Sequence, residues 1–184
     1  MKPMPNRGVL LLSEPFMMDI NFIRSVILLV EHNERGTIGF VLNQPINLSM
    51  RDAMEDFPNC NPGLFKGGPC ETNTLHYIHT VGHLIEGSTE IMQGIFWGGD
   101  HEQMLQLFRE GKVTEKDFRF FIGYSGWTPG QLEKETESKS WITAPANFQY
   151  LFNTPADALW RTVLKSMGDK YSIIADAPLD PGWN

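Results

Sequence analysis

The 184-residue chain has few cysteines and no long hydrophobic run, and these two shortages exclude several classes of protein. Two cysteines, Cys60 and Cys70, are too few for the disulfide framework of a small secreted domain. Their spacing also differs from that of a redox pair or a zinc knuckle, so we expect two reduced thiols. The longest aliphatic run, Val26–Val30, is far shorter than the about 20 residues of a membrane span.

The beginning of the chain offers only Val9–Leu12 as an apolar run. A secretory signal peptide needs about 7–15 apolar residues there. We therefore expect a soluble, cytoplasmic protein.

Positive charge is also in short supply. Lys and Arg number 15 against 22 Asp and Glu, which gives a formal net charge of -7. The basic residues are scattered, and the small group Arg161, Lys165 and Lys170 is typical of a solvated helix face. Because an acidic surface repels phosphate backbones, we do not expect direct contact with nucleic acid.

Short apolar or alternating segments predict a sheet. The length fits one domain, 1–184, and no linker divides it. Val26–Val30 is apolar throughout, so we expect both of its faces to be covered, and Thr37–Leu42 completes a hairpin that Pro45 ends. The other expected strands are Gly8–Leu12, Leu75–Val81, Glu90–Trp97 and Phe118–Tyr124, with Tyr171–Ala175 as a further candidate.

Helix starts are marked by capping pairs between these segments. Ser49 with Asp52, Asp100 with Gln103 and Thr114 with Asp117 each resemble a capping box. Thr128-Pro129-Gly130-Gln131 and Thr154-Pro155-Ala156-Asp157 place a Thr cap before a proline at the first helical position. The last helix carries a stripe that we expect to be buried: Leu159, Trp160, Val163, Leu164 and Met167. The predicted class is α+β: a single compact domain with a mixed, largely antiparallel sheet and helices packed on it.

No pattern in the chain predicts a metal, a cofactor or a catalytic nucleophile. His76 and His79 lie three apart on a strand and would face opposite sides, so with His83 they do not predict a metal site. Ser125 lies in Gly123-Tyr124-Ser125-Gly126-Trp127, which lacks the Gly-x-Ser-x-Gly spacing of a nucleophile elbow. The pair Gly98-Gly99 is followed by Asp100, whose carboxylate would cap the next helix and repel an anion.

Aromatic residues beside glycines are the candidates for ligand binding. Tyr124 and Trp127 either belong to the core or line a shallow pocket with Asn43 and the Gly67-Gly68 turn. Gln131 either closes a helix cap or faces a cleft with Asn43 and Tyr124. The candidate ligand-binding residues are Asn43, Gly67, Gly68, Tyr124, Trp127 and Gln131.

Several motifs together resemble the YqgE/AlgH family. They are Gly8–Leu11, Asp19, Phe22, Ser25–Leu29, Glu31-His32, Gly39–Pro45, Gly67–Pro69, Arg119–Trp127, Pro129–Glu133 and Trp141. The resemblance runs from about Gly8 to Gly168. It implies a compact bacterial α and β protein of a family without an established activity, whose members are often labelled transcriptional regulators. This chain departs from the family pattern at Gln44, where an Arg is common, and at Cys70, where a Val is common.

The resemblance and the missing catalytic pattern favour a regulatory or binding protein that is not an enzyme and acts on a protein partner or a small ligand. The alternatives are an enzyme or ligand-binding protein with its cleft near Asn43, Tyr124 and Gln131, and a DNA-binding regulator. Only the family label suggests the last of these.

Overall fold

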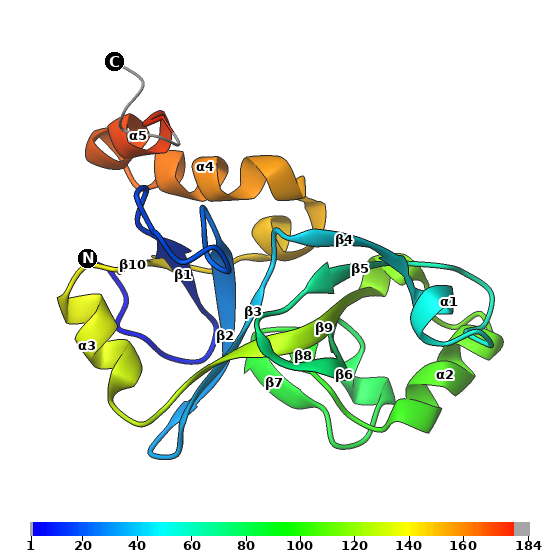
Figure 1. Ribbon diagram of the computed structural model, residues 1–184. Helices are drawn as coiled ribbons and strands as arrows, with labels where there is room; N and C mark the ends of the chain where they lie inside the picture. Colours follow the sequence, from blue (N-terminus) through cyan, green and yellow to red (C-terminus); the bar gives the residue numbers. More distant parts are fainter. Residues whose placement is uncertain (1, 179–184) are drawn as a thin grey trace.

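Ten strands of the described residues, 2–178, join into one sheet in the computed structural model (Figure 1). The strand order is β10-β1-β2-β3-β9-β6-β8-β7, and β5 joins at β9 and carries β4 on its other side. Every strand pair is antiparallel except β5 with β9. The strands are β1 (Val9–Ser13), β2 (Val26–Asn33), β3 (Gly36–Val41), β4 (Pro45–Ser49), β5 (Gly63–Lys66), β6 (Cys70–His79), β7 (Thr89–Met92), β8 (Ile95–Trp97), β9 (Phe118–Trp127) and β10 (Trp141–Pro145).

The helices lie between and around these strands. They are α1 (Met50–Ala53), α2 (His101–Arg109), α3 (Gln131–Glu137), α4 (Ala156–Ser166) and α5 (Asp169–Ala175). Three further helical turns are η1 (Gly82–Leu84), η2 (Glu115–Asp117) and η3 (Gln149–Asn153). A largely antiparallel sheet with helices packed on it is the α+β class that the sequence predicts.

Strand β2 confirms the sequence prediction, since Val26–Val30 are fully buried. The β2–β3 hairpin is tight, because the polar residues after Val30 stay in the ladder up to the pair Asn33–Gly36. The hairpin projects from the body of the molecule (Figure 1), so its polar residues meet solvent without leaving the strand.

Strand β9 runs through the interior of the sheet and continues three residues beyond the predicted end at Tyr124, to Trp127. It pairs with β3, β5 and β6, so it joins the two halves of the sheet.

Four short strands differ from the sequence expectation. Glu90–Trp97 is two strands, because the Gln93-Gly94 turn folds β7 back onto β8. Pro45 begins β4, a position at which a strand tolerates a residue without an N–H. The turn-rich stretch after Asn59 contains β5, which the parallel contact with β9 holds.

Three of the predicted helix caps are present. The boxes at Ser49 with Asp52 and at Thr114 with Asp117 are present, and the Asp100 carboxylate accepts the Gln103 N–H at 2.8 Å. The helix after Ser49 is short and ends at Ala53.

The prediction of helix caps at Thr128 and Thr154 is wrong. At α3, Gln131 reaches back to the Thr128 N–H at 3.0 Å as predicted, but the helix begins only after Gly130, which has φ 77. At α4 the cap residue is Pro155, because the Thr154 hydroxyl instead donates to the carbonyl of Gln149.

Residues Tyr171–Ala175 form α5 rather than a strand. Tyr171, Ile174 and Ala175 recur at helical spacing and pack on the core beside α4, which favours a helix over sheet pairing.

Three groups of buried side chains hold the layers together. Alternate residues of β1 and β2, such as Leu10 and Leu28, pack under α4, including its predicted stripe at Leu159, Trp160, Val163 and Leu164. The residues between them, such as Leu11 and Ile27, pack with Leu132 of α3. The other half of the sheet packs with α1 and α2. Figure 1 shows α4 and α5 on one side of the sheet and α3 near its β10 edge.

Candidate functional site

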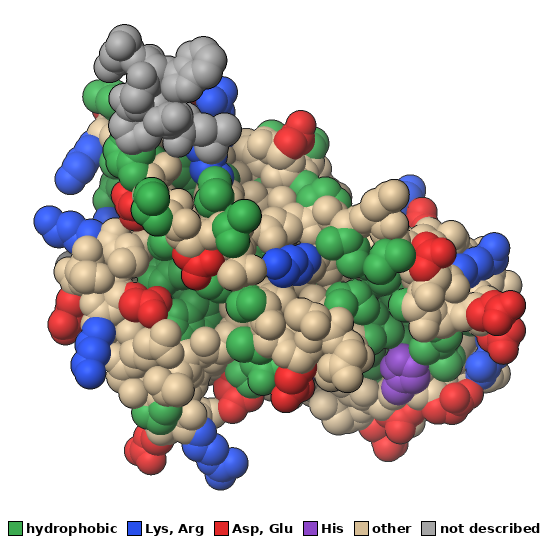
Figure 2. Space-filling view, viewed as in Figure 1, with side chains coloured by type: hydrophobic (Ala, Val, Ile, Leu, Met, Phe, Trp, Pro, Cys, Tyr) green, Lys and Arg blue, Asp and Glu red, His purple; other side chains and the backbone are tan. Residues whose placement is uncertain are grey.

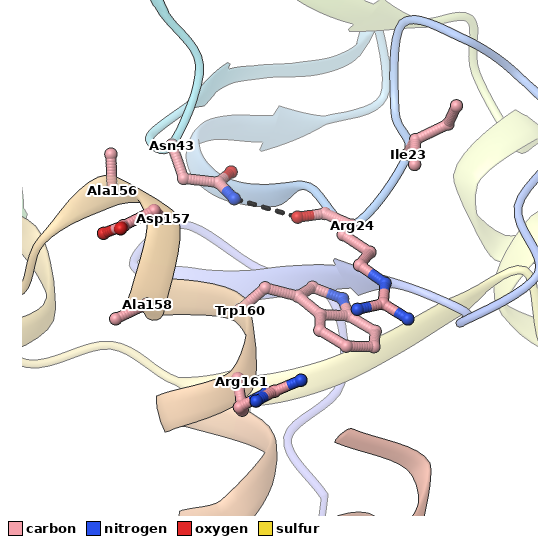
Figure 3. Close-up of a pocket in the computed structure, with 8 residues that line it drawn as sticks. All are labelled: Ile23, Arg24, Asn43, Ala156, Asp157, Ala158, Trp160 and Arg161. Carbon is pink, nitrogen blue, oxygen red and sulfur yellow. Dashed lines mark hydrogen bonds between the residues drawn. The ribbon is translucent and has the colours of Figure 1, made fainter. Parts of the chain in front are cut away.

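A pocket of about 520 Å³ lies where the β1–β2 loop, the end of β3 and the start of α4 meet (Figure 3). Two arginines, an indole and an amide face it. Its lining residues are Ile23, Arg24, Asn43, Ala156, Asp157, Ala158, Trp160 and Arg161.

The backbone at Arg24 is held in an uncommon conformation, with φ 47. Asn43 fixes it: the Asn43 Nδ2 donates to the Arg24 carbonyl, and its Oδ1 accepts the Val26 N–H, both at 2.8 Å. Gln44 donates to the Asn21 carbonyl and the Ser25 hydroxyl. Gln44 therefore anchors the loop that carries Arg24.

The Arg24 guanidinium stacks on Trp160, 5.0 Å from the ring centroid. Trp160 is itself fixed, because its Nε1 donates to the Ser13 carbonyl at 3.0 Å. Arg24 also donates to the carbonyl of Ala177, but it has no carboxylate within ion-pair distance among the described residues. A stacked guanidinium of this kind is a ready partner for an anion.

The charge in the pocket is predominantly positive. Burial and the neighbouring Arg161 lower the pKa of the Arg24 guanidinium below its ordinary value. The Arg161 Nε lies 3.7 Å from the Asp176 Oδ1, and the Lys165 Nζ lies 3.1 Å from the same oxygen. Figure 3 shows both guanidinium groups beside the Trp160 ring, while the Asp157 carboxylate points away from them.

The start of α4 adds backbone donors to the same pocket. Its cap residue, Pro155, makes no side-chain hydrogen bond, so the N–H groups of Ala156 and Asp157 have no capping partner in the described structure. Such N–H groups and the helix dipole favour an anion.

Arg119 of β9 supports the pocket from behind. Its guanidinium is buried, donates to the Leu151 carbonyl at 2.6 Å and to the Leu42 carbonyl, and lies over the Phe65 ring. Burial lowers its pKa to about 10, so it remains charged near neutral pH. It thereby ties the end of β3, next to Asn43, to the turn that precedes α4.

The six residues predicted to bind a ligand do not share one pocket. Asn43 lies in the Arg24 pocket, whereas Tyr124 and Trp127 line a second pocket, of about 400 Å³, beside the turn end of the β2–β3 hairpin. Gly67 and Gly68 pack against the β9 backbone, where an added Cβ would lie 2.2 Å from the Gly123 oxygen and 2.3 Å from the Tyr124 carbonyl. Because neither glycine has a side chain, the β9 backbone can lie close to both residues.

Trp127 and Gln131 belong to a carboxylate-centred network below α3. The Glu135 Oε2 accepts the indole N–H of Trp127 at 2.9 Å and that of Trp141 at 2.8 Å, and Gln131 donates to its other oxygen. Tyr124 remains half-buried in the second pocket, and burial, followed by Glu71 and Cys70, raises its pKa.

The histidines do not converge. His76 packs against Phe40 and Tyr124, whereas His79 stacks between Phe96 and Phe118. Within residues 2–178, no group of three or more His, Cys, Asp or Glu has metal-binding geometry.

One serine lies near a histidine, Ser88 at 3.3 Å from the His79 Nε2. That nitrogen also lies 2.8 Å from the Gly98 carbonyl, which only accepts, so Nε2 carries the proton. A protonated Nε2 cannot take the hydroxyl proton, so this pair is not arranged for nucleophilic catalysis.

The comparisons with known proteins agree on one family. The model of the AlgH-like family matches residues 10–172. The chain belongs to the AlgH-like family. This confirms the resemblance seen in the sequence motifs.

Its relatives match over nearly their whole length. A UPF0301 protein of Chlorobaculum tepidum is 41% identical over 96% of this chain and 95% of its own. A UPF0301 protein of Cytophaga hutchinsonii is 38% identical over 98% of this chain and 100% of its own. The names of these relatives state no activity.

Two solved structures share the fold of this AlgH-like chain. The AlgH protein of Pseudomonas aeruginosa superposes with a TM-score of 0.74 at 28% identity, covering 97% of this chain and 98% of its own. Protein DIP2367 of Corynebacterium diphtheriae gives 0.80 at 22% identity, covering 96% and 95%. At that identity the second likeness shows the fold alone.

Sequence reasoning missed Arg24, Trp160 and Arg161 as members of one pocket. It placed Trp160 in the buried stripe, which is correct, and Arg161 on a solvated face. Local pattern carries no signal for the contact of Trp160 with Arg24, which lies more than a hundred residues earlier in the chain.

Proposed function

We propose that this AlgH-like protein is a regulatory or binding protein without catalytic activity, and that its pocket at Arg24 takes a small anionic ligand. The observation that carries the proposal is the Arg24 guanidinium, stacked on Trp160 beside Arg161 and without a carboxylate partner in the described structure. The unusual backbone at Arg24 supports it, because strained residues persist where the surroundings hold them and often mark binding sites.

The ligand chemistry follows from the donors. A planar guanidinium pairs with phosphate or carboxylate through two parallel hydrogen bonds, and the free N–H groups of α4 suit the same oxygen atoms. Asn43, among the predicted site residues, positions Arg24 in this proposal. Tyr124 stays a candidate for a second ligand at its own pocket.

The cellular setting belongs to the same proposal. Both cysteines are free thiols, which suits a reducing compartment such as the cytoplasm. No helix in residues 2–178 is long and apolar enough to cross a membrane. The net charge of -7 argues against direct DNA contact, and on the face in Figure 2 basic and acidic side chains are interspersed.

Calorimetric titration with pyrophosphate, and separately with citrate, tests the proposal. We expect one-to-one binding of at least one of them, and Arg24→Gln should weaken it about tenfold or more because it removes a charged bidentate donor. Arg24→Lys should also weaken binding, because an ammonium cannot pair in the same planar geometry. Arg51→Gln, at an exposed arginine of α1, is the matched control. Absence of binding at millimolar concentration, or equal loss in the control, would overturn the proposal.

A further inference from the structure

An apolar groove of about 590 Å³ lies at the β10 end of the sheet, and it shares no lining residue with the Arg24 pocket. The amino-terminal segment, the start of the β1–β2 loop, the end of α3 and α5 form its walls, and Figure 1 shows them at that end of the molecule. Trp141 and Thr143 of β10 close its floor, since they are only 4% and 3% exposed. Pockets that bind small molecules have volumes of about 300–1,000 Å³, so this groove has the size for one.

The walls of the groove leave apolar side chains in contact with solvent. Met4 is 81% exposed and Phe16 is 45% exposed, while Tyr171 and Ile174 of α5 line the groove half-buried. Exposed apolar surface of this kind marks binding grooves, because covering it removes it from water. Prolines at positions 3, 5 and 15 restrict the backbone of the two wall segments, so a ligand that contacts them orders little additional chain.

The charge in the groove is positive, although the whole chain is acidic. Lys2, Lys139 and Lys170 line it against a single acid, Glu14. None of the three lysines has a carboxylate within ion-pair distance in the described structure. The Lys2 ammonium instead lies over the Tyr171 ring, 4.9 Å from its centroid. Lysines beside an apolar lining are complementary to a molecule with an apolar body and an anionic end.

Lys139 is held at this groove against the preference of its backbone. It has φ 66 and follows the end of α3, where its N–H donates to the Thr136 carbonyl at 3.0 Å. Glycine is the usual residue at such a helix end, because a Cβ strains the left-handed conformation. A lysine at this position supports a role for its charge at the groove.

We propose that this groove, which we call the β10 groove, binds a free single-chain amphipathic carboxylate of the medium-chain fatty-acid type. The hydrocarbon chain packs along Phe16, Tyr171 and Ile174, and the carboxylate pairs with the lysines. Because walls rise on several sides of the floor, the groove takes one molecule rather than the flat surface of a bilayer. This proposal is independent of the anion pocket at Arg24.

Calorimetric titrations with octanoate, decanoate and decylammonium, each below its micelle concentration, test the proposal. We expect decanoate to bind one-to-one and octanoate to bind about tenfold more weakly, because it buries two fewer methylene groups. Decylammonium has the same chain, and repulsion by the lysines should weaken it at least about tenfold. Lys139→Gln with Lys170→Gln should weaken decanoate by about tenfold as well. Lys112→Gln with Lys116→Gln, beside α2, carries the same charge change and should leave binding unaltered.

A second pair of variants tests the apolar wall. Phe16→Ser should weaken decanoate about fivefold, because it removes apolar contact area. Phe148→Ser removes a similarly exposed ring outside the groove, 49% against 45%, and should leave binding unaltered. Arg24→Gln should also leave decanoate binding unaltered, which separates this site from the anion pocket.

Three results would overturn the proposal: absence of saturable decanoate binding, equal affinity for decanoate and decylammonium, or equal losses in the paired variants. Sedimentation with phosphatidylglycerol vesicles addresses the lipid surface as a competing occupant. We expect the protein to stay in the supernatant. Co-sedimentation with the vesicles, without one-to-one binding of decanoate, would assign the groove to a membrane surface and would also overturn the proposal.

Discussion

Arg119 is a buried arginine whose guanidinium is hydrogen-bonded to carbonyl groups rather than paired with a carboxylate. It donates to Leu151 and Leu42, which lie far apart in the chain, and so connects the approach to α4 with the end of β3. A short apolar side chain there would leave both carbonyls without that donor.

We therefore expect Arg119→Met to lower the free energy of unfolding by about 2–4 kcal/mol. Urea unfolding followed by circular dichroism measures it. Arg109→Met is the matched control at an exposed position, where the pair with Glu102 contributes about 0–1 kcal/mol. If the two variants lost equal stability, Arg119 would not connect these elements as described.

His79 makes stability depend on pH. Burial lowers its pKa in the folded protein, and only the hydrogen bond to Gly98 opposes this. The unfolded chain, with a pKa near about 6.5, therefore binds the proton first as pH falls. Stability contributed by the neutral form is present above that pH and is lost as pH falls below it towards the lower folded pKa.

The expected result is a fall in melting temperature between about pH 6.5 and 5 that becomes smaller in His79→Gln. Gln keeps a donor for the Gly98 carbonyl but does not titrate. His83→Gln, at an exposed position, controls for the loss of an imidazole. An unchanged pH profile in His79→Gln would contradict this account; burial also lowers the pKa of His76, which accounts for part of any remaining slope.

At the scale of elements, the start of α3 shows how a turn replaces a cap. Pro129 and Gly130 form a turn, and the left-handed conformation of Gly130 lets the helix begin at Gln131. The Thr128 hydroxyl is exposed and donates to the Gln131 side chain instead of capping the helix.

We expect Gly130→Ala to destabilise the protein by about 1–2 kcal/mol, because φ 77 strains any residue with a Cβ. No atom lies within 4 Å of the added Cβ, so the loss of stability reports the backbone strain at this position alone. Thr128→Ala should change stability by less than about 0.5 kcal/mol. Chemical denaturation of both variants checks the pair, and a larger loss at Thr128 would restore the cap that the sequence predicts.

At the scale of the whole molecule, the sheet is continuous through β9. Because β9 pairs with β3 of one half and with β5 and β6 of the other, the two halves share one strand, and we expect them to unfold together. We expect one cooperative calorimetric transition, with equal calorimetric and van't Hoff enthalpies. Two separate transitions, or a protease-resistant half, would contradict the prediction of one domain over 1–184.

The sequence by itself determined the class of the fold, the fully buried strand at Val26–Val30, the strand at Phe118–Tyr124 and the stripe of α4. These features depend on burial patterns and on local capping, which can be recognised from residues close together in the chain. The motifs were also sufficient to place the chain in its family.

Only the tertiary structure decided where β5 and α5 belong and which residues share a pocket. Gly63–Lys66 becomes a strand because β9 lies beside it, and Tyr171–Ala175 becomes a helix because its apolar face meets the core under α4. Asn43 and Tyr124 lie in different pockets, whereas Arg24 and Trp160 meet in one. Such contacts join residues far apart in the chain, and their energy depends on packing that local sequence does not contain.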